Sequence, residues 1–375
     1  MIGAAAGWLL GVLLAADCRR CPTLPSDPDL DQARAGLSEA YSQVALCAPC
    51  EDSILSKAAQ AIVAGPRESL PDPVALQHAI QEAGGGDPSP RAMLLSARDP
   101  KALARDLDQQ WRPQATDEIV GLGLARTMGG VRLVVLAAER KVSVDPLPAR
   151  IPVGAEVRIS GALLGVLHSP SVYIEGPNGM VAQIKAALSG SRFSARFEPN
   201  ETGSYAVEVL GQGPRGPEVV FLKSIAVGRA STDDLPPREE PAGPDDDAAV
   251  LDQINRERLR YGAPALSPDP RLARVAQAYA RELRELGIFA HVSPLSGDLK
   301  ARLRRVGYPF RSAAENLAQG PTALQAQALA ANSPAHRRAM LDPEYTRCGI
   351  GLSRAIAGGG STDVLLVEVF ALEGP

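Results

Sequence analysis

Hydrophobic positions change their spacing twice along this chain of 375 residues. Before about residue 141 and again after residue 248, apolar residues recur every three or four positions, as in helices that cover a core on one side. Between 142 and 228 they alternate with polar residues, as in Val157 and Ile159 or in Val207 and Val209. The pattern therefore predicts three folded parts, which suits a chain of this length.

The first and last parts are expected to combine helices with a buried sheet, in an α+β arrangement. In residues 18–141 we expect helices near 28–46, 53–64, 73–83 and 100–110, and a buried strand from Val131 to Ala138. In residues 248–375 we expect helices at 249–261, 270–287, 298–306 and 323–331, and strands at 349–354 and 363–370. Helices stacked on a central antiparallel sheet predict a three-layer α+β sandwich for the C-terminal part.

The middle part, residues 142–228, is expected to be a β-sandwich. Short alternating runs are separated by turn signals such as Pro177-Asn178-Gly179 and Ser189-Gly190-Ser191. The segment Thr202-Gly203-Ser204-Tyr205 resembles the tyrosine corner of immunoglobulin-like domains, so we expect that architecture here. Residues 229–247, rich in Pro, Glu and Asp, read as an acidic linker.

The N-terminus carries a candidate export signal. Residues Ile2 to Ala16 form an apolar run that is too short to span a membrane but fits the core of a signal peptide, here residues 1–17. We therefore expect a secreted, periplasmic or cell-envelope protein with no transmembrane span in its mature form. Lipid attachment at Cys18, as in a lipoprotein, is the alternative. Against it, Asp17 stands directly before Cys18, where lipoprotein signals carry a small residue. The net charge of −4 argues against a general nucleic-acid binder.

Four of the five cysteines form two C-x-x-C pairs, Cys18 with Cys21 and Cys47 with Cys50. The spacing suits a four-thiolate zinc site, whereas export to an oxidising compartment favours two disulfides. Both readings stay open, with disulfides preferred. Cys348 has no partner in its own part of the chain and is expected to be a buried, small apolar residue.

Three clusters near the C-terminus set two of the four histidines and a glutamate among small residues. They are Phe289-Ala290-His291-Val292-Ser293-Pro294, Ala314-Glu315-Asn316-Leu317-Ala318 and Asn332-Ser333-Pro334-Ala335-His336-Arg337. Together with the helix through Tyr279, the segment Leu341-Asp342-Pro343-Glu344-Tyr345 and Gly349-Ile350-Gly351, their order resembles the CAP superfamily. This is the fold of cysteine-rich secretory, antigen 5 and pathogenesis-related proteins, and the match is to its bacterial secreted branch.

The resemblance implies a cleft and names its residues. His291, Glu315 and His336 match the family's two histidines and one of its glutamates, so they are the expected ligands of zinc or another divalent cation. Asn316 and Ser333 are expected to line the same ligand-binding cleft. The family's second acidic residue is missing, because Ala330 and Ser333 hold the aligned places.

The leading functional hypothesis is that this cleft binds a small, peptide-like or cell-envelope ligand without turnover. A metal-assisted hydrolase, with Glu315 as the base that activates a metal-bound water, is the first alternative. A structural envelope or adhesion module, in which the two histidines and Glu315 only anchor loops, is the second. The chain shows no Ser or Cys nucleophile motif, so an enzyme is not the favoured reading.

The N-terminal part resembles a degenerate copy of the C-terminal part. Lys57-Ala58-Ala59-Gln60-Ala61 parallels Arg274-Val275-Ala276-Gln277-Ala278, and Gly121-Leu122-Gly123 parallels Gly349-Ile350-Gly351, in the same order. The first copy lacks both histidines and the glutamate, since Ala92-Met93-Leu94-Leu95 stands where Ala314-Glu315-Asn316-Leu317 stands in the second. A helical domain with chance similarity is the alternative for this part.

Overall fold

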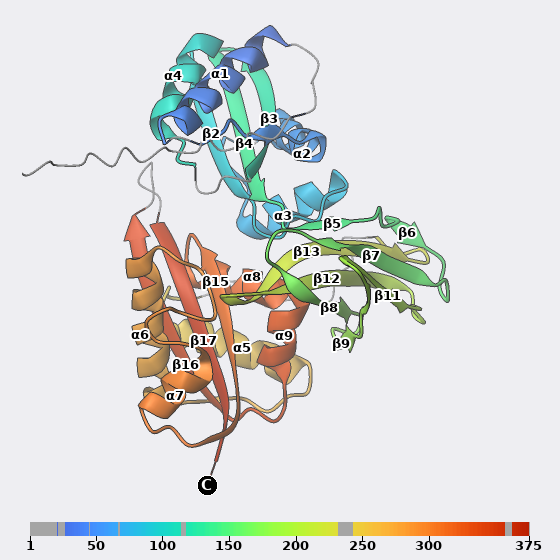
Figure 1. Ribbon diagram of the computed structural model, residues 1–375, viewed down its shortest axis with the longest axis vertical. Helices are drawn as coiled ribbons and strands as arrows, with labels where there is room; N and C mark the ends of the chain where they lie inside the picture. Colours follow the sequence, from blue (N-terminus) through green and yellow to red (C-terminus); the bar gives the residue numbers. More distant parts are fainter. Residues whose placement is uncertain are drawn as a thin grey trace, which may run out of the picture.

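The computed structural model describes residues 21, 27–44, 46–66, 68–113, 118–231, 243–356 and 362–374. Helices and sheets gather into three bodies, and the C-terminal body packs against the side of the β-sheet body (Figure 1). The expected signal peptide, Cys18 and most of the acidic linker lie outside the described residues. The domain boundaries therefore stay a prediction. In the described ranges, no helix is both long enough and apolar enough to cross a membrane.

The N-terminal body places four helices around a four-stranded sheet of order β1-β3-β4-β2. An aspartate caps each helix N-terminus, and proline follows that aspartate in three of the four helices, which fixes where they begin. A disulfide joins Cys21 to Cys50, and Cys47 is also disulfide-bonded, in line with the preferred reading of the cysteines. The elements are α1 (Pro28–Ser42), β1 (Cys50–Glu51), α2 (Ser53–Ala64), α3 (Pro73–Glu82), β2 (Arg91–Ala97), α4 (Pro100–Gln110), β3 (Glu118–Thr127) and β4 (Gly130–Glu139).

The middle body is made of two sheets that share one apolar core. Their strand orders are β10-β11-β7-β5 and β6-β13-β12-β8-β9. Tyr205 donates its hydroxyl hydrogen to the Glu201 carbonyl at 3.4 Å, as the tyrosine-corner motif predicts, while the immunoglobulin-like class itself stays a prediction. The strands are β5 (Val142–Val144), β6 (Arg150–Ile151), β7 (Val157–Leu163), β8 (His168–Glu175), β9 (Val181–Ile184), β10 (Ala187–Ser189), β11 (Arg192–Phe197), β12 (Gly203–Gly213) and β13 (Gly216–Val227).

The C-terminal body has the three-layer α+β arrangement that its sequence predicts. One apolar cluster lies between the sheet and α5, α8 and α9, and a second lies between the sheet and α6 and α7. The sheet order is β14-β16-β17-β15, and Cys348 is buried in the first cluster. The elements are α5 (Asp247–Arg260), β14 (Ser267–Pro268), α6 (Pro270–Leu286), α7 (Leu299–Arg305), β15 (Phe310–Gly320), α8 (Ala323–Asn332), α9 (Pro334–Leu341), β16 (Arg347–Ile356) and β17 (Thr362–Glu373).

Two glycines bring the sheet of the C-terminal body against α6. A Cβ at Gly349 or Gly351 would overlap the backbone of this helix, so only glycine permits the approach. The Gln277 side chain completes the contact, because it donates to the Leu352 carbonyl at 2.9 Å and accepts from the Leu352 amide at 3.1 Å.

The N-terminal body contains the same local arrangement. A Cβ at Gly121 or Gly123 would overlap the backbone of α2, and the Gln60 side chain bonds both the carbonyl and the amide of Leu124. Across the N-terminal sheet, Gly121 pairs with Leu136, which pairs with Ala92. Across the C-terminal sheet, Gly349 pairs with Val369, which pairs with Glu315. When the two sheets are matched at these glycines, Ala92 takes the position of Glu315. The correspondence is therefore shifted by one residue from the one expected from the sequence.

Candidate functional site

β15 carries the glutamate and the asparagine of the candidate cleft on its two faces. It lies at one edge of the sheet, and successive side chains of a strand point to opposite sides. Glu315 therefore lies on the side of α6 and α7, together with Leu317, and Asn316 lies on the side of α8 and α9. The sequence pattern did not predict this strand, because polar residues on both of its faces obscure the alternation of apolar and polar positions.

The Glu315 carboxylate is held by two side chains. Its Oε1 lies 3.1 Å from Nδ1 of His291, and its Oε2 forms an ion pair with the guanidinium of Arg302. The glutamate side chain is only 3% exposed, so the ion pair is shielded from solvent. Both oxygens are engaged by residues of the same domain.

Arg302 is the site residue that the sequence did not reveal. It lies on α7 in a run of basic residues, where a solvent-facing side chain would be the ordinary expectation. Instead its guanidinium stacks 3.4 Å from the ring centroid of Tyr279 and donates to the Gly297 carbonyl at 2.7 Å. These contacts hold the cation against Glu315.

The loop that carries His291 is fixed by hydrogen bonds to α6. The Tyr279 hydroxyl donates to the Ala290 carbonyl at 2.6 Å, and Glu282 accepts from the hydroxyls of Ser293 and Ser296. The His291 side chain is 20% exposed, so it is the accessible member of the pair formed with Glu315.

His336 lies on α9, a helix of eight residues that the sequence analysis did not predict. Ser333 caps this helix, and its hydroxyl oxygen accepts from the His336 amide. The Nδ1 atom of His336 is shielded from solvent and has no hydrogen-bond partner among the described residues. Burial, helped by the neighbouring His291, lowers the pKa of His336 to about 3, so its imidazole is neutral at physiological pH.

Asn316 links α9 to the centre of the sheet. Its amide group donates to the His336 carbonyl at 3.1 Å and to Oε2 of Glu368 at 3.0 Å. Glu368 is fully buried on β17, and this burial raises its pKa to about 8. Asn316 therefore holds the helix that carries His336, and its side chain does not face Glu315.

These residues fit a divalent metal poorly. Within the described ranges, no group of three His, Cys, Asp or Glu side chains is arranged to hold a metal ion. The Arg302 guanidinium already neutralises Glu315, and a second cation beside it would be repelled. The structure thus brings His291 and Glu315 into contact and places His336 near them, but it gives the carboxylate a different partner from the expected metal.

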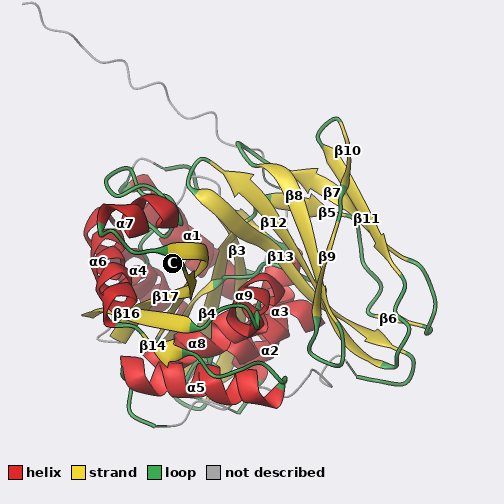
Figure 2. Ribbon diagram, turned by 90° about the horizontal axis from the view of Figure 1, so that it is seen from below, coloured by secondary structure: helices red, strands yellow, loops and turns green. Residues whose placement is uncertain are grey.

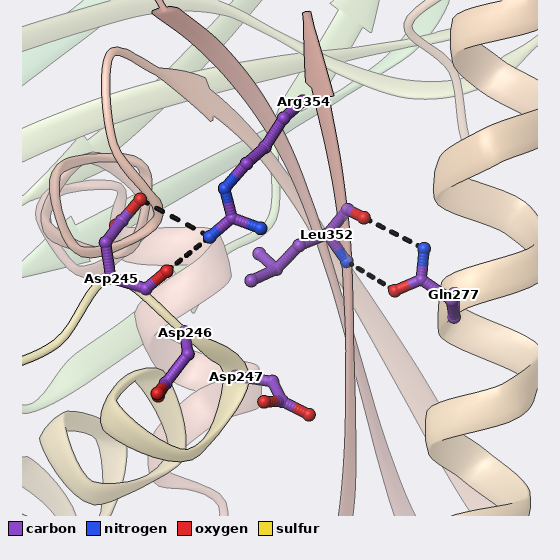
Figure 3. Close-up of a pocket in the computed structure, with 6 residues that line it drawn as sticks. All are labelled: Asp245, Asp246, Asp247, Gln277, Leu352 and Arg354. Carbon is purple, nitrogen blue, oxygen red and sulfur yellow. Dashed lines mark hydrogen bonds and ion pairs between the residues drawn. The ribbon is translucent and has the colours of Figure 1, made fainter.

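A hollow on the same domain lies elsewhere, and its polar residues have structural partners. Asp245, Asp246, Asp247, Gln277, Leu352 and Arg354 line it (Figure 3). Asp245 accepts from the Ala323 amide at 2.6 Å and pairs with Arg354, and Asp246 caps α5. These groups join helix ends to β16, so this hollow is not a candidate site.

Comparison with known proteins identifies the C-terminal body. Residues 251–370 match the model of the Cysteine-rich secretory protein family, CAP. The uncharacterized membrane protein YlbC of Bacillus subtilis is 36% identical over 109 residues, which are 28% of this chain and 31% of YlbC. The uncharacterized protein YkwD of the same organism is 30% identical over 103 residues, which are 27% of this chain and 40% of YkwD. The chain thus spans less than half the length of either curated relative.

Solved structures with some likeness include bacterial proteins. An extracellular protein with an SCP domain from Bacillus anthracis is 19% identical, with a TM-score of 0.29, and covers 62% of this chain and 86% of that one. A cysteine-rich secretory protein from Staphylococcus aureus is 12% identical, with a TM-score of 0.28, and covers 58% and 76%. The family match over residues 251–370 confirms the resemblance seen in the sequence: this part of the chain is a CAP domain.

Proposed function

We propose that the CAP domain binds a small, peptide-like or cell-envelope ligand, without turnover, on the surface at the β15 edge of the sheet. There the His291 loop from one side of the sheet and α9, with His336, from the other side both contact β15, the strand of Glu315. The observation that carries this proposal is the buried ion pair between Arg302 and Glu315. A general base needs a free lone pair within reach of the proton it removes. The Glu315 side chain is only 3% exposed and is held by His291 and Arg302, so a water molecule has little access to its remaining lone pairs. We therefore infer that this carboxylate serves to position the His291 loop and α7.

The binding face itself offers what a peptide-like ligand needs. His291 is partly exposed beside a buried carboxylate, and apolar side chains from the same loop, Phe289 and Leu295, are 51% and 67% exposed. Polar groups that fix orientation, set among apolar surface, are typical of ligand sites.

Affinity selection tests this proposal. The full chain is incubated with a random peptide library, and the retained peptides are identified by mass spectrometry. We expect retention by the wild type and at least about a tenfold loss of affinity, or 1.4 kcal/mol, in His291→Ala. His168→Ala, which removes an exposed histidine of the β-sandwich, is the matched control and should bind as the wild type does. Equal binding by His291→Ala would move the ligand away from this face and favour the structural envelope module.

Calorimetry tests whether His291, Glu315 and His336 bind the zinc ion that the family resemblance implies. Zinc is titrated into the wild type and into a variant that combines His291→Ala with His336→Ala. Because Arg302 pairs with Glu315, we expect no zinc binding that depends on the two histidines. Histidine-dependent zinc binding near neutral pH, lost as pH falls through about 6.5, would instead support the metal-assisted alternative.

Export is part of the same proposal. The apolar run at Ile2 to Ala16 supports a signal peptide, and the disulfide between Cys21 and Cys50 is of the kind that persists in an oxidising compartment. Labelling of intact and broken cells with an antibody against the CAP domain checks the location. Protein found only in the cytoplasm would contradict export and the cell-envelope location of the ligand.

We also infer that the N-terminal body is a degenerate CAP-like copy kept as a scaffold. The shared strand order, the paired glycines against α2 and α6, and the matching bonds of Gln60 and Gln277 support a common origin. Where the CAP domain has Glu315 and Asn316, the register gives the first copy Ala92 and Met93. An experimental structure in which the two sheets fail to superpose would contradict this reading.

A further inference from the structure

The β-sandwich turns a polar face toward the CAP domain. Val207 and Val209 of β12 point into the sandwich core, so Glu208 between them points outward. Glu175 at the end of β8 also lies on the outward side, next to Ile174 of the core. In a free β-sandwich these two carboxylates would meet water, yet both are almost completely buried. The element that covers them is α9, which both ribbon views place beside β8, β9 and β12 (Figure 2).

Glu208 sits at the N-terminus of α9, close to His336. Its carboxylate accepts from the Ser333 hydroxyl at 2.6 Å and from the Ala335 amide at 2.7 Å. A helix N-terminus favours an anion. However, removal from water raises the pKa of Glu208 to about 7, so part of the gain from these hydrogen bonds is lost to desolvation.

Arg337, the residue after His336, forms a second link between the domains. Its buried guanidinium pairs with Glu257 of the CAP domain and with Glu175 of the β-sandwich, the latter at 3.1 Å. It also lies 4.4 Å from the ring centroid of Tyr261. Because Glu257 and Tyr261 stay with Arg337 when the domains part, separation would not leave this cation unpaired inside the CAP domain.

The tip of the hairpin between β12 and β13 reaches the other histidine. The Arg215 carbonyl accepts from the Val292 amide at 2.9 Å. Gly216, whose φ is +104°, lies so close that a Cβ there would be 2.8 Å from the Cβ of His291. The β-sandwich thus contacts both segments that carry the cleft histidines, the loop of His291 and the helix of His336.

We propose that the β-sandwich is an intramolecular cover of the CAP-domain surface that carries His291 and His336, with Glu208 seated on α9 and the Arg215–Gly216 tip closed on the His291 loop. The proposal rests on ligand binding at this face and adds its regulation. A peptide-like ligand that needs the covered part of the face binds only the open arrangement, so the cost of opening lowers its apparent affinity. Anything that loosens the cover then raises affinity without a new contact to the ligand.

The contact between the β-sandwich and the CAP domain can be tested without any ligand, because the chemical modification rate of each of the four histidines can be measured separately. Diethyl pyrocarbonate modifies accessible neutral imidazoles, and mass spectrometry assigns the rate to each residue. The variant Glu208→Lys places a cation at the N-terminus of α9 and should open the cover. Glu156→Lys is the matched control, since Glu156 is exposed on the same domain and pairs with Arg196. We expect His291 and His336 to react at least about fivefold faster in Glu208→Lys, with His168 unchanged.

Amide hydrogen exchange gives a second readout. The Val292 amide has its acceptor on the β-sandwich, whereas the amides of Ser293 and Arg337 have acceptors inside the CAP domain. The Ala335 amide is left out of the comparison, because its acceptor is the Glu208 carboxylate that the variants remove. Opening should speed exchange at Val292 and leave exchange at Ser293 and Arg337 unchanged. The milder variant Glu208→Ala, which only removes the carboxylate, provides the same comparison if Glu208→Lys folds poorly.

Two results would overturn the cover. One is wild-type modification rates at His291 and His336 together with a wild-type exchange rate at Val292 in both Glu208 variants. The other is equal acceleration of exchange at Val292, Ser293 and Arg337, which would show that the two domains form one cooperative core and not a body with a movable cover. Neither result depends on ligand binding, so a failed cover and a failed binding proposal are distinguishable.

Discussion

Glu368 gives the sharpest test of the electrostatics inside the CAP domain. It is fully buried on β17, and the Asn316 amide is its hydrogen-bond donor. Burial raises its pKa from 4.5 to about 8. A group whose pKa is raised by folding stabilises the folded state below its unfolded pKa, and this stabilisation is lost as pH rises through the folded pKa. The window for Glu368 therefore runs from about pH 4.5 to 8.

Glu368→Gln removes the titration and keeps the shape of the side chain. From the two pKa values, the glutamate should lose roughly 3 kcal/mol of stability between pH 5 and pH 8 relative to glutamine. The variant should then be close to the wild type at pH 5 and clearly more stable at pH 8. Other titrating groups contribute equally to both proteins and cancel in the difference.

Urea unfolding of both proteins at pH 5, 6, 7 and 8 measures this difference. Signals specific to the CAP domain are needed, because a chain of several domains need not unfold in one step. Hydrogen exchange of slowly exchanging β17 amides supplies them. A stability difference that is the same at all four pH values would refute the reasoning, since it would mean that Glu368 does not change its protonation on folding.

Three further predictions concern packing, the domain contact and the disulfide. Gly351→Val should cost at least about 2 kcal/mol, because its Cβ would overlap the backbone of Ala276, and unchanged urea unfolding would contradict it. Arg337→Met should cost about 3–5 kcal/mol, because it removes the buried cation that pairs with Glu175 and Glu257, and a smaller loss than about 1 kcal/mol would contradict it. Cys21→Ser should lower the stability of the N-terminal body by about 2–4 kcal/mol, seen as a lower melting temperature; a wild-type value would contradict it.

Local signals made most helices predictable. An aspartate followed by proline begins α1, α3, α4 and α6, and Gly287 ends α6 with a left-handed backbone. These signals act within a few residues, so a single sequence contains them. The short helix α9 and the edge strand β15 escaped prediction, because a helix of eight residues and a strand with two polar faces show no clear period.

The candidate site was predictable only in part. His291, Glu315 and His336 stand out through their sequence setting, and the structure joins the first two directly. Arg302 lies hidden among basic residues, and Glu208 reads as an ordinary outward residue between two valines. Glu208 gains its role from Ser333, which lies 125 residues away in the chain, and no local pattern encodes such a contact.

Product analysis distinguishes binding without turnover from hydrolysis. The full chain and Glu315→Gln are incubated with peptide and ester libraries, with and without zinc, and the reaction mixtures are followed by mass spectrometry. Because His291 and Arg302 hold the buried Glu315 carboxylate, we expect retained, chemically unchanged peptides and the same absence of products in both proteins. Products formed by the wild type and lost in Glu315→Gln would contradict this expectation and establish the hydrolase.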